Sequence, residues 1–203
     1  MHHTLRNYKP IPLLSRMAKT LERMVNKRFN WFLENLGILS NEAGFRRNRS
    51  TRQQVTKLNQ HIMAALDKSK VLTAVSVDFS SANDSVWKEN LILKLYKVGV
   101  TSNMLKWFES FIGERYCKVK YGHSYSHCKI LRTGVPQGAV LSCTLFNIYV
   151  NDLIADLTSV NEIKCLMYAD DLVLWSEASK YRATKNTENV LNKGIRQTRK
   201  LVL

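Results

Sequence analysis

The sequence predicts an α+β fold in which a small antiparallel sheet packs on helices. The clearest strand covers residues 71–79, where apolar and polar side chains alternate. A second strand-like segment, residues 166–175, contains two adjacent acids, Asp170 and Asp171, within an apolar run. Helical and strand patterns alternate along the chain without the regular rhythm of a doubly wound parallel sheet, which favours an antiparallel arrangement.

The composition is that of a basic globular protein. The 203 residues are 45% hydrophobic, enough for a core, and 31 Lys and Arg against 16 Asp and Glu give a net charge of +15. This charge attracts polyanions, nucleic acid above all, although a membrane surface or the ribosome is an alternative partner. The sequence shows no N-terminal apolar leader and no apolar run near twenty residues, which argues against secretion and a membrane span. The spacing of the four cysteines predicts reduced thiols in an intracellular protein.

Two helices are expected before the first strand. Apolar residues at steps of three and four predict a helix over residues 15–36 that ends at Gly37. Ser50, with Gln53 three residues later, predicts the N-terminal cap of a second helix that runs to about Lys68. The polar side of the first helix faces either solvent or nucleic acid and carries five cations: Arg16, Lys19, Arg23, Lys27 and Arg28.

The elements after the first strand follow from glycine positions and apolar periodicity. The tail after Glu177 is polar and predicted to be weakly helical, with an interruption at Gly194. The other expected elements are helices over about residues 87–98 and 102–112, a basic hairpin turning near Gly122, a loop at 134–138 and a helix over about 139–157.

Three acids form the candidate catalytic group. Burying two adjacent charges in an apolar run costs several kcal/mol each, so Asp170 and Asp171 are expected at the tip of a hairpin. Asp78 ends the first strand, 92 positions before Asp170, and two adjacent antiparallel strands would bring these ends together. The alternative is that each acid is an ordinary turn or cap residue.

Clustered carboxylates predict a divalent cation, because they repel one another unless a cation lies among them. Hard oxygen ligands favour Mg²⁺ or Mn²⁺. Two such ions about 4 Å apart can activate a 3′-hydroxyl and stabilise a leaving pyrophosphate. Together with the basic surface, the acids therefore predict nucleotidyl transfer.

Five motifs, in order along the chain, carry a family resemblance. The chain resembles the reverse transcriptases of non-LTR retrotransposons, the LINE type, and most of all those of jockey-like elements. The first motif is followed by Lys19 and Glu22, which belong to the same resemblance. The motifs are YKPIPLLS (8–15), GFRRNRST (44–51), VDFSSANDSVW (77–87), GVPQGAVLS (134–142) and YADD (168–171).

The resemblance implies an RNA-directed DNA polymerase with a palm and helical fingers. Residues 1–70 would form a fingers-like region, 71–176 the palm, and 177–203 a truncated tail leading toward a missing palm end and thumb. Asp78 and Asp170 would hold two Mg²⁺ ions, or Mn²⁺, with Asp171 assisting. The implied partners are an RNA template, a DNA primer and deoxynucleoside triphosphates, with no membrane and an undetermined oligomeric state.

The resemblance also implies contacts to the nucleotide and the template. Glycines let the backbone approach a base pair, and a glutamine can both donate and accept hydrogen bonds, which suits the loop at 134–138. Basic residues in these motifs could instead be generic phosphate contacts. The implied contact residues are Phe79 through its backbone, Asn83, Pro136, Gln137, Gly138, Lys9, Lys19 and Arg46.

The chain also departs from the family pattern. Asn83 stands where the family normally carries Phe or Tyr, whose ring crowds the sugar 2′ position, so weakened sugar discrimination or impaired activity is expected. Pro12 and Glu42 are smaller departures. The length suggests a fragment or a decayed copy, with no endonuclease region before residue 1. Two alternatives remain open: an inactive nucleic-acid-binding remnant, and another palm enzyme such as an RNA-dependent RNA polymerase. The location is expected to be intracellular, in the nucleus, the cytoplasm or both, without a clear signal.

Overall fold

The computed structural model describes residues 13–39, 44–46, 48–79, 81–160, 162–179 and 183–202. It combines helices with small antiparallel sheets, which confirms the expected α+β class. The helices are α1 (Arg16–Asn35), α2 (Thr51–Asp67), α3 (Lys88–Lys97), α4 (Ser102–Ile112), α5 (Val140–Ser159) and α6 (Ala183–Val202). The strands are β1 (Lys70–Asp78), β2 (Arg115–Cys117), β3 (Lys120–Tyr121), β4 (Ser124–Tyr125), β5 (Lys129–Leu131), β6 (Lys164–Tyr168) and β7 (Asp171–Ser179).

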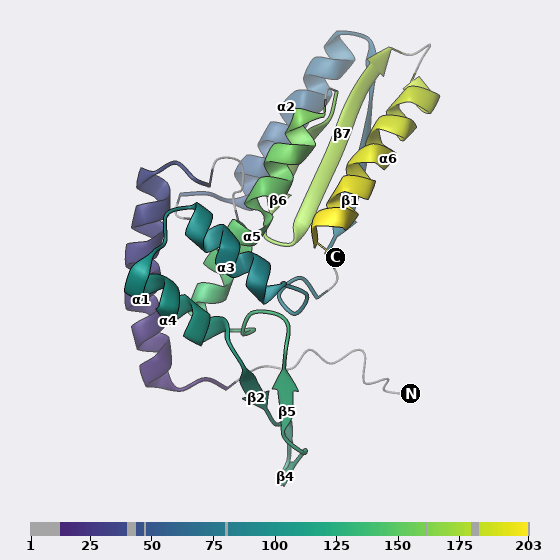
Figure 1. Ribbon diagram of the computed structural model, residues 1–203. Helices are drawn as coiled ribbons and strands as arrows, with labels where there is room; N and C mark the ends of the chain where they lie inside the picture. The colour runs from purple at the N-terminus through teal and green to yellow at the C-terminus, as the bar shows by residue number, and fades with distance from the viewer. Residues whose placement is uncertain are drawn as a thin grey trace.

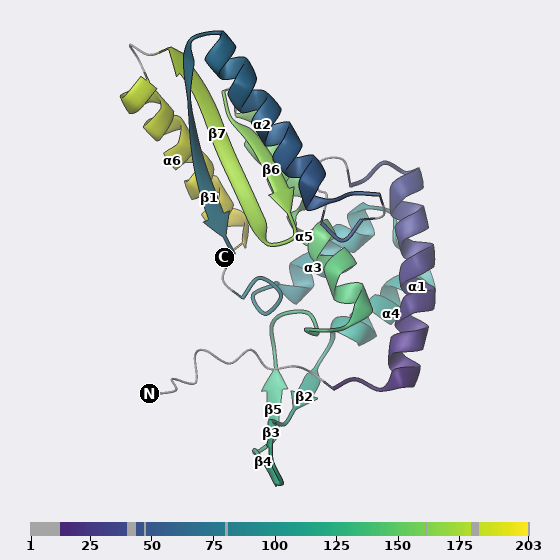
Figure 2. The ribbon, with the colours of Figure 1, turned by 180° about the vertical axis from the view of Figure 1, so that it is seen from behind.

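A three-stranded sheet forms the centre of the fold, in the order β1-β7-β6. Both pairings are antiparallel, so β7 lies between two strands that run against it. Helices α5 and α6 cover one face of this sheet and α2 covers the other (Figures 1 and 2). Alternate residues of β7 serve the two faces: Leu172 and Leu174 are buried toward α5 and α6, whereas the Trp175 ring lies 5.2 Å from the ring of His61 on α2.

Helix α5 runs through the core and contacts α1, α3, α6 and β6. By length and composition it could cross a membrane, but 67% of its most apolar stretch is buried inside the protein, as in a core helix. Helix α1 crosses it on one side, and the Lys94 ammonium of α3 donates to the Asp152 carboxylate at 2.6 Å and to the Tyr149 carbonyl on another. Helix α5 is apolar on nearly all sides, and such a helix is stable only when it is buried.

Two helix boundaries agree with the sequence signals. The Ser50 hydroxyl accepts from the Gln53 N–H at 3.4 Å, and the Gln53 side chain accepts from the Ser50 N–H at 3.2 Å, so the expected capping box is present. Helix α1 ends just before Gly37, whose φ of +61° is a conformation that glycine adopts without strain. The basic hairpin is also present and turns at Gly122 between β3 and β4.

The exposed side of α1 differs from the expected amphipathic pattern. The buried side is made by Glu22, Phe29 and Leu33. Met17 and Met24, which fall on the apolar positions of the sequence, are exposed. Leu33 is buried and Val25 and Phe32 pack against the core as the apolar periodicity predicts. The departure is therefore confined to the other apolar positions, while the acid Glu22 takes part in the buried side.

The tail is helical as expected, but the predicted interruption was wrong, because α6 continues through Gly194 without a break. The buried side of α6 is Thr187, Leu191, Gly194 and Thr198, a helical stripe in which a single large apolar residue lies among small and polar ones. A Cβ placed on Gly194 would lie 3.1 Å from Ile163 Cδ1 and 3.4 Å from Leu174 Cδ1. The glycine therefore permits close packing of α6 on the sheet.

We expect that packing to limit the size of the residue at position 194. Gly194→Val should lower the free energy of unfolding by about 1–3 kcal/mol through overpacking. Gly194→Ala should change it much less, because a gain in helix propensity of about 1 kcal/mol offsets the tight contact. Urea denaturation followed by circular dichroism measures both variants, and equal stability of the valine variant and the wild type would contradict the packing argument.

Candidate active site

Two of the three candidate acids are paired on adjacent strands of the central sheet. Asp78, the last residue of β1, is the antiparallel partner of Asp171, the first residue of β7. Tyr168 of β6 is the partner of Asp171 on its other side, so Tyr168, Asp171 and Asp78 form one row at the end of the sheet. Directly opposed residues point to the same face, and both acids are exposed. The two acids therefore occupy neighbouring, solvent-exposed positions on one face of the sheet end.

Asp170 occupies the two-residue turn between β6 and β7. Ala169 takes a φ of +57°, which lets the strands reverse within this short turn. The Asp170 carbonyl accepts a hydrogen bond from the Phe79 N–H at 3.4 Å, which joins the turn to the residue that follows Asp78. Thus the expected meeting of the two strand ends is observed. The Phe79 side chain itself is buried in the core.

The donor set at this edge fits a hard divalent cation. Three exposed carboxylates gather at one end of the sheet, and Mg²⁺ is commonly bound by only one or two carboxylates, with waters and substrate phosphates as the remaining ligands. Among the residues that the structure describes, no three His, Cys, Asp or Glu side chains are already arranged as a metal site.

The loop at 134–138 packs directly on the turn that follows β1. The Val135 N–H donates to the Asn83 carbonyl at 2.8 Å, and the Gly134 N–H donates to the Val86 carbonyl at 2.9 Å. Gly134 has a φ of +79°, and a Cβ there would lie 2.7 Å from the Asn83 carbonyl oxygen. Only glycine fits this contact. The structure therefore brings Asn83 and the loop together.

Side chains on both sides of the loop hold it in place. The Gln137 amide donates to the Asp84 carboxylate at 3.1 Å. The Pro136 carbonyl accepts from the Ser142 hydroxyl at 2.6 Å, and Arg115 donates to the Gly134 carbonyl at 2.6 Å. Pro136 is buried, Gln137 is half-buried and Gly138 is exposed, so the loop presents its second half to solvent.

A buried acid from α1 caps the helix that follows this loop. Ala139, at the N-terminus of α5, supplies no side-chain cap. Instead, Glu22 Oε2 accepts from the Val140 N–H at 2.6 Å and from the Leu141 N–H at 3.5 Å, and the Glu22 side chain is buried. The partial positive charge of a helix N-terminus favours a carboxylate there. Sequence reasoning placed Glu22 in a motif but found no role for it, because its partners lie 118 positions away.

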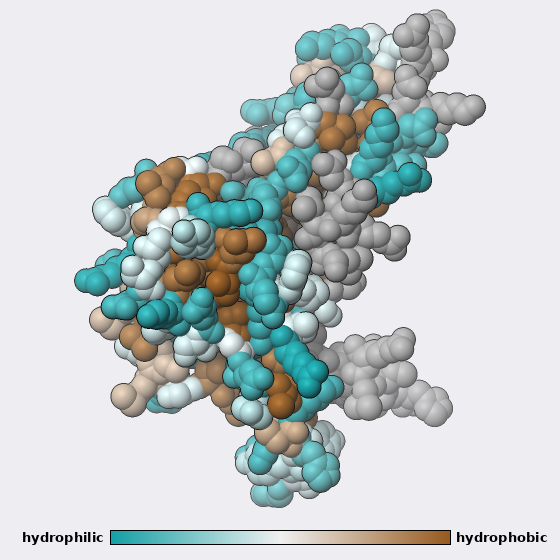
Figure 3. Space-filling model, in the orientation of Figure 1, coloured by the Kyte–Doolittle hydropathy of each residue, from teal (hydrophilic) through white to brown (hydrophobic). Residues whose placement is uncertain are grey.

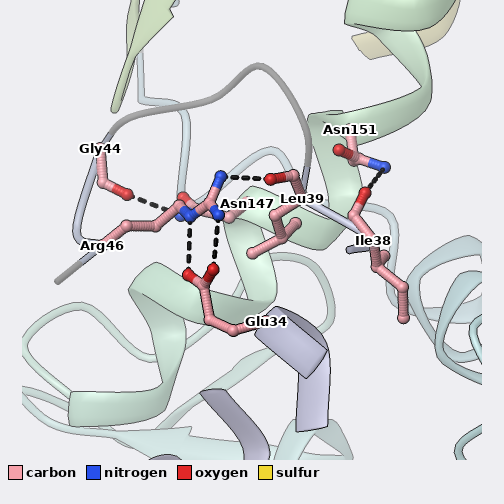
Figure 4. Close-up of polar contacts among 7 residues, drawn as sticks. All are labelled: Glu34, Ile38, Leu39, Gly44, Arg46, Asn147 and Asn151. Carbon is pink, nitrogen blue, oxygen red and sulfur yellow. Dashed lines mark hydrogen bonds and ion pairs between the residues drawn. The ribbon is translucent and has the colours of Figure 1, made fainter. Parts of the chain in front are cut away.

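Arg46 forms an ion pair and hydrogen bonds with other residues of the fold. Its guanidinium donates to both oxygens of Glu34, at 2.8 and 2.7 Å, and to the Leu39 carbonyl (Figure 4). The hydrogen bond from Arg46 holds the pKa of Glu34 below its usual value. The Arg46 side chain is 8% exposed. This placement favours a structural role, joining α1 to the segment that follows it, over the expected contact with triphosphate or template.

Two asparagines of α5 complete this connection. The Asn147 amide donates to the Gly44 carbonyl at 2.7 Å, and the Asn151 amide donates to the Ile38 carbonyl at 3.0 Å (Figure 4). Side chains of α5 therefore hold the segment after α1 by bonding to the backbone carbonyls of that segment. Of the other expected contact residues, Lys19 is half-buried on α1, whereas Lys9, Pro12 and Glu42 lie outside the described residues.

Comparison with known proteins identifies the family. A family model described as reverse transcriptase (RNA-dependent DNA polymerase) matches residues 2–201. The chain belongs to the reverse transcriptase family. Members of this family bind nucleic acid and generally use divalent metal ions.

Relatives of this reverse transcriptase chain include transposon proteins of Drosophila melanogaster. It is 34% identical over 173 residues to a probable RNA-directed DNA polymerase from transposon BS, covering 83% of this chain and 19% of the relative. It is 28% identical over 192 residues to the RNA-directed DNA polymerase from the mobile element jockey, covering 92% of this chain and 21% of the relative. The expected resemblance to jockey-like enzymes is confirmed, and the chain spans about a fifth of the length of these relatives.

Solved structures support the reverse transcriptase fold. An apo telomerase from Candida tropicalis matches 91% of this chain and 34% of its own length, with a TM-score of 0.62 and 15% identity. A telomerase from the same organism, in complex with a fragment of telomeric RNA, gives a TM-score of 0.63 at 14% identity, over 90% of this chain and 32% of its own length. These neighbours show a polymerase palm fold.

We expect Glu22 to be essential for the stability of this arrangement. Glu22→Gln should lower the free energy of unfolding by about 1–3 kcal/mol, because it removes the charge from the buried helix cap, and Glu22→Ala should cost more. The matched control is Glu109→Gln, an exposed acid on α4, which should be close to neutral. Thermal and urea unfolding measure all three variants. A neutral Glu22→Ala variant would show that the contact contributes nothing.

Proposed function

We propose that this chain forms the catalytic core of an RNA-directed DNA polymerase that extends a primer 3′-hydroxyl by two-metal nucleotidyl transfer. The supporting observation is that three acidic residues occupy one end of the sheet, with Asp78 opposite Asp171 and the Asp170 carbonyl bonded to the Phe79 N–H. Membership of the reverse transcriptase family supports the same chemistry.

The acids have different roles in this proposal. Asp78 and Asp170 hold two Mg²⁺ ions, or Mn²⁺, and Asp171 assists from the neighbouring strand position. Bound there, the ions would supply activation of the 3′-hydroxyl and charge neutralisation at the leaving pyrophosphate. The exposure of all three side chains leaves this edge open to a nucleic-acid duplex and a triphosphate.

The second half of the 134–138 loop forms the pocket in which the template base meets the incoming nucleotide. Gln137 and Gly138 face this pocket with the backbone around Phe79, and Pro136 positions them through its bond to Ser142. Asn83 lies beside the nucleotide sugar. The partners are an RNA template, a DNA primer and deoxynucleoside triphosphates, and Lys9 and Lys19 contact their phosphates. In this proposal residues 1–70 serve as fingers and 71–176 as the palm.

We expect primer extension to depend on the acids. Asp78→Asn and Asp170→Asn should each lower extension of a DNA primer on an RNA template by more than about a hundredfold, since each removes a ligand charge. Asp67→Asn, at the far end of α2, is the matched control and should extend like the wild type. Chelation of Mg²⁺ with EDTA should abolish the reaction, and Mn²⁺ should restore it.

The same assay separates the enzyme from a non-catalytic remnant. A remnant that binds nucleic acid through charge alone would give salt-sensitive RNA binding with no extension, and Asp170→Asn would leave that binding unchanged. Absence of extension by the wild type, under conditions where it binds the primer and template, would contradict the proposal.

Position 83 gives a test of sugar selectivity. Asn83 is smaller than a ring, so we expect the chain to discriminate weakly between deoxyribonucleotides and ribonucleotides. Asn83→Tyr should raise the ratio of kcat/KM for the two nucleotides by roughly tenfold or more, because its ring crowds the 2′ position. Single-nucleotide incorporation measures this ratio. The idea fails if the wild type already rejects ribonucleotides as strongly as the variant.

A further inference from the structure

Residues 115–132, here called the basic hairpin, project away from the rest of the protein. Strand β2 pairs with β5 at its base, and β3 pairs with β4 at its tip. Figures 1 and 2 show the basic hairpin extending beyond the helices, and Figure 3 shows it as a narrow extension of the surface. Residues 118–130 are all exposed. The tip is therefore an isolated two-stranded ribbon, a structure that is marginally stable by itself.

The tip carries aromatic rings that have no core to pack in. Tyr116, Tyr121 and Tyr125 are 65%, 89% and 65% exposed. The contact found at the Tyr125 ring is the Lys120 ammonium, 5.6 Å from the ring centroid. Three exposed rings within ten residues are costly in water, so their faces are open to a planar partner.

The basic hairpin is also strongly cationic. It holds five cations and two histidines, and no acid lies in the sequence between Glu114 and Asp152. Arg115 donates to the Gly134 carbonyl and is half-buried, so it belongs to the base of the hairpin. The exposed cations are Lys118, Lys120, Lys129 and Arg132.

The base of the basic hairpin is joined to the candidate active site. Arg115 donates to the carbonyl of Gly134, the residue that packs on the turn after Asp78. Lys88 donates to the Leu131 carbonyl at 2.9 Å and to the Gly113 carbonyl at 2.8 Å, which fixes both ends of the hairpin. A strand bound at the tip would therefore be held at a set position relative to the 134–138 loop.

We propose that the basic hairpin binds an unpaired nucleic-acid strand beside the active site. The rings of Tyr121 and Tyr125 stack on bases, and Lys118, Lys120 and Lys129 contact phosphates. Stacking on aromatic side chains with cations along the backbone is the usual chemistry of single-strand binding. An unpaired strand is favoured over a duplex, because paired bases hide their faces within the helix. The inference rests on the proposed function, which brings a template strand to this edge.

The test measures binding by the 203-residue chain without Mg²⁺ or nucleotides. The probe is a fluorescein-labelled, unstructured RNA of about 15 nucleotides, compared by anisotropy with a duplex of the same length. Tyr121→Ala with Tyr125→Ala should weaken single-strand binding by at least about tenfold and leave duplex binding nearly unchanged. The same positions changed to Phe keep the rings and should restore binding. Tyr96→Ala, an exposed tyrosine on α3, is the matched control.

The charge contribution has its own readout. Changing Lys118, Lys120 and Lys129 to Gln should reduce the slope of log Kd against log salt by about 2, whereas Lys106→Gln on α4 should change it by less than 1. Circular dichroism melting should show unchanged folding in all variants, because every substituted side chain is exposed. Unchanged single-strand affinity in the double Ala variant, or equal losses for single strand and duplex, would overturn the proposal. So would failure of the Phe variant to bind.

These outcomes are separate from those of the primer-extension assay. If the wild type extends primers and the Tyr variants bind single strands normally, the basic hairpin inference fails and the proposed function stands. If the wild type does not extend primers but its single-strand binding depends on Tyr121 and Tyr125, the proposed function fails and the hairpin still binds nucleic acid.

Discussion

The antiparallel register between β1 and β7 is the constraint on which the candidate active site depends. Nine residue pairs form this register, and the last places Asp78 opposite Asp171. Because side chains alternate with a period of two, a slip of one residue would put these acids on opposite faces of the sheet. Burial sets the register: Leu174 is buried toward α6 and Trp175 toward α2. The position of the exposed acids is therefore decided by apolar residues that have no part in the chemistry.

A second constraint links α1 to the 134–138 loop. Glu22 on α1 caps α5, and α5 begins directly after the 134–138 loop. A local cap would have fixed the start of α5 only relative to its own loop. A carboxylate supplied from α1 makes the loop position depend on how α1 packs, and Asn147 and Asn151 tie the segment after α1 to the same helix. The cost of burying the Glu22 charge is offset by two backbone N–H groups and the helix dipole.

What the sequence could predict was set by the range of each interaction. The Ser50 cap, the stop at Gly37 and the acid hairpin depend on residues within a few positions, and the structure confirms them. Arg46 and Glu34 are 12 positions apart, and no local pattern marks their ion pair. The continuity of α6 through Gly194 was not predicted, because a glycine inside a polar helical pattern reads as a break, whereas here it lies in contact with Ile163 and Leu174 and allows close packing on the sheet.

The positive charge of the chain does not by itself locate a nucleic-acid surface. Lys88, Lys94 and Arg115 donate to backbone carbonyls or to an acid within the fold, and Arg46 pairs with Glu34. Such cations stabilise the junctions between elements and offer little to a phosphate. A binding surface needs cations that are exposed, free of neighbouring acids and connected to the site. Among the elements that the structure describes, the basic hairpin meets all three conditions, and its exposed rings add the means to tell unpaired bases from a duplex.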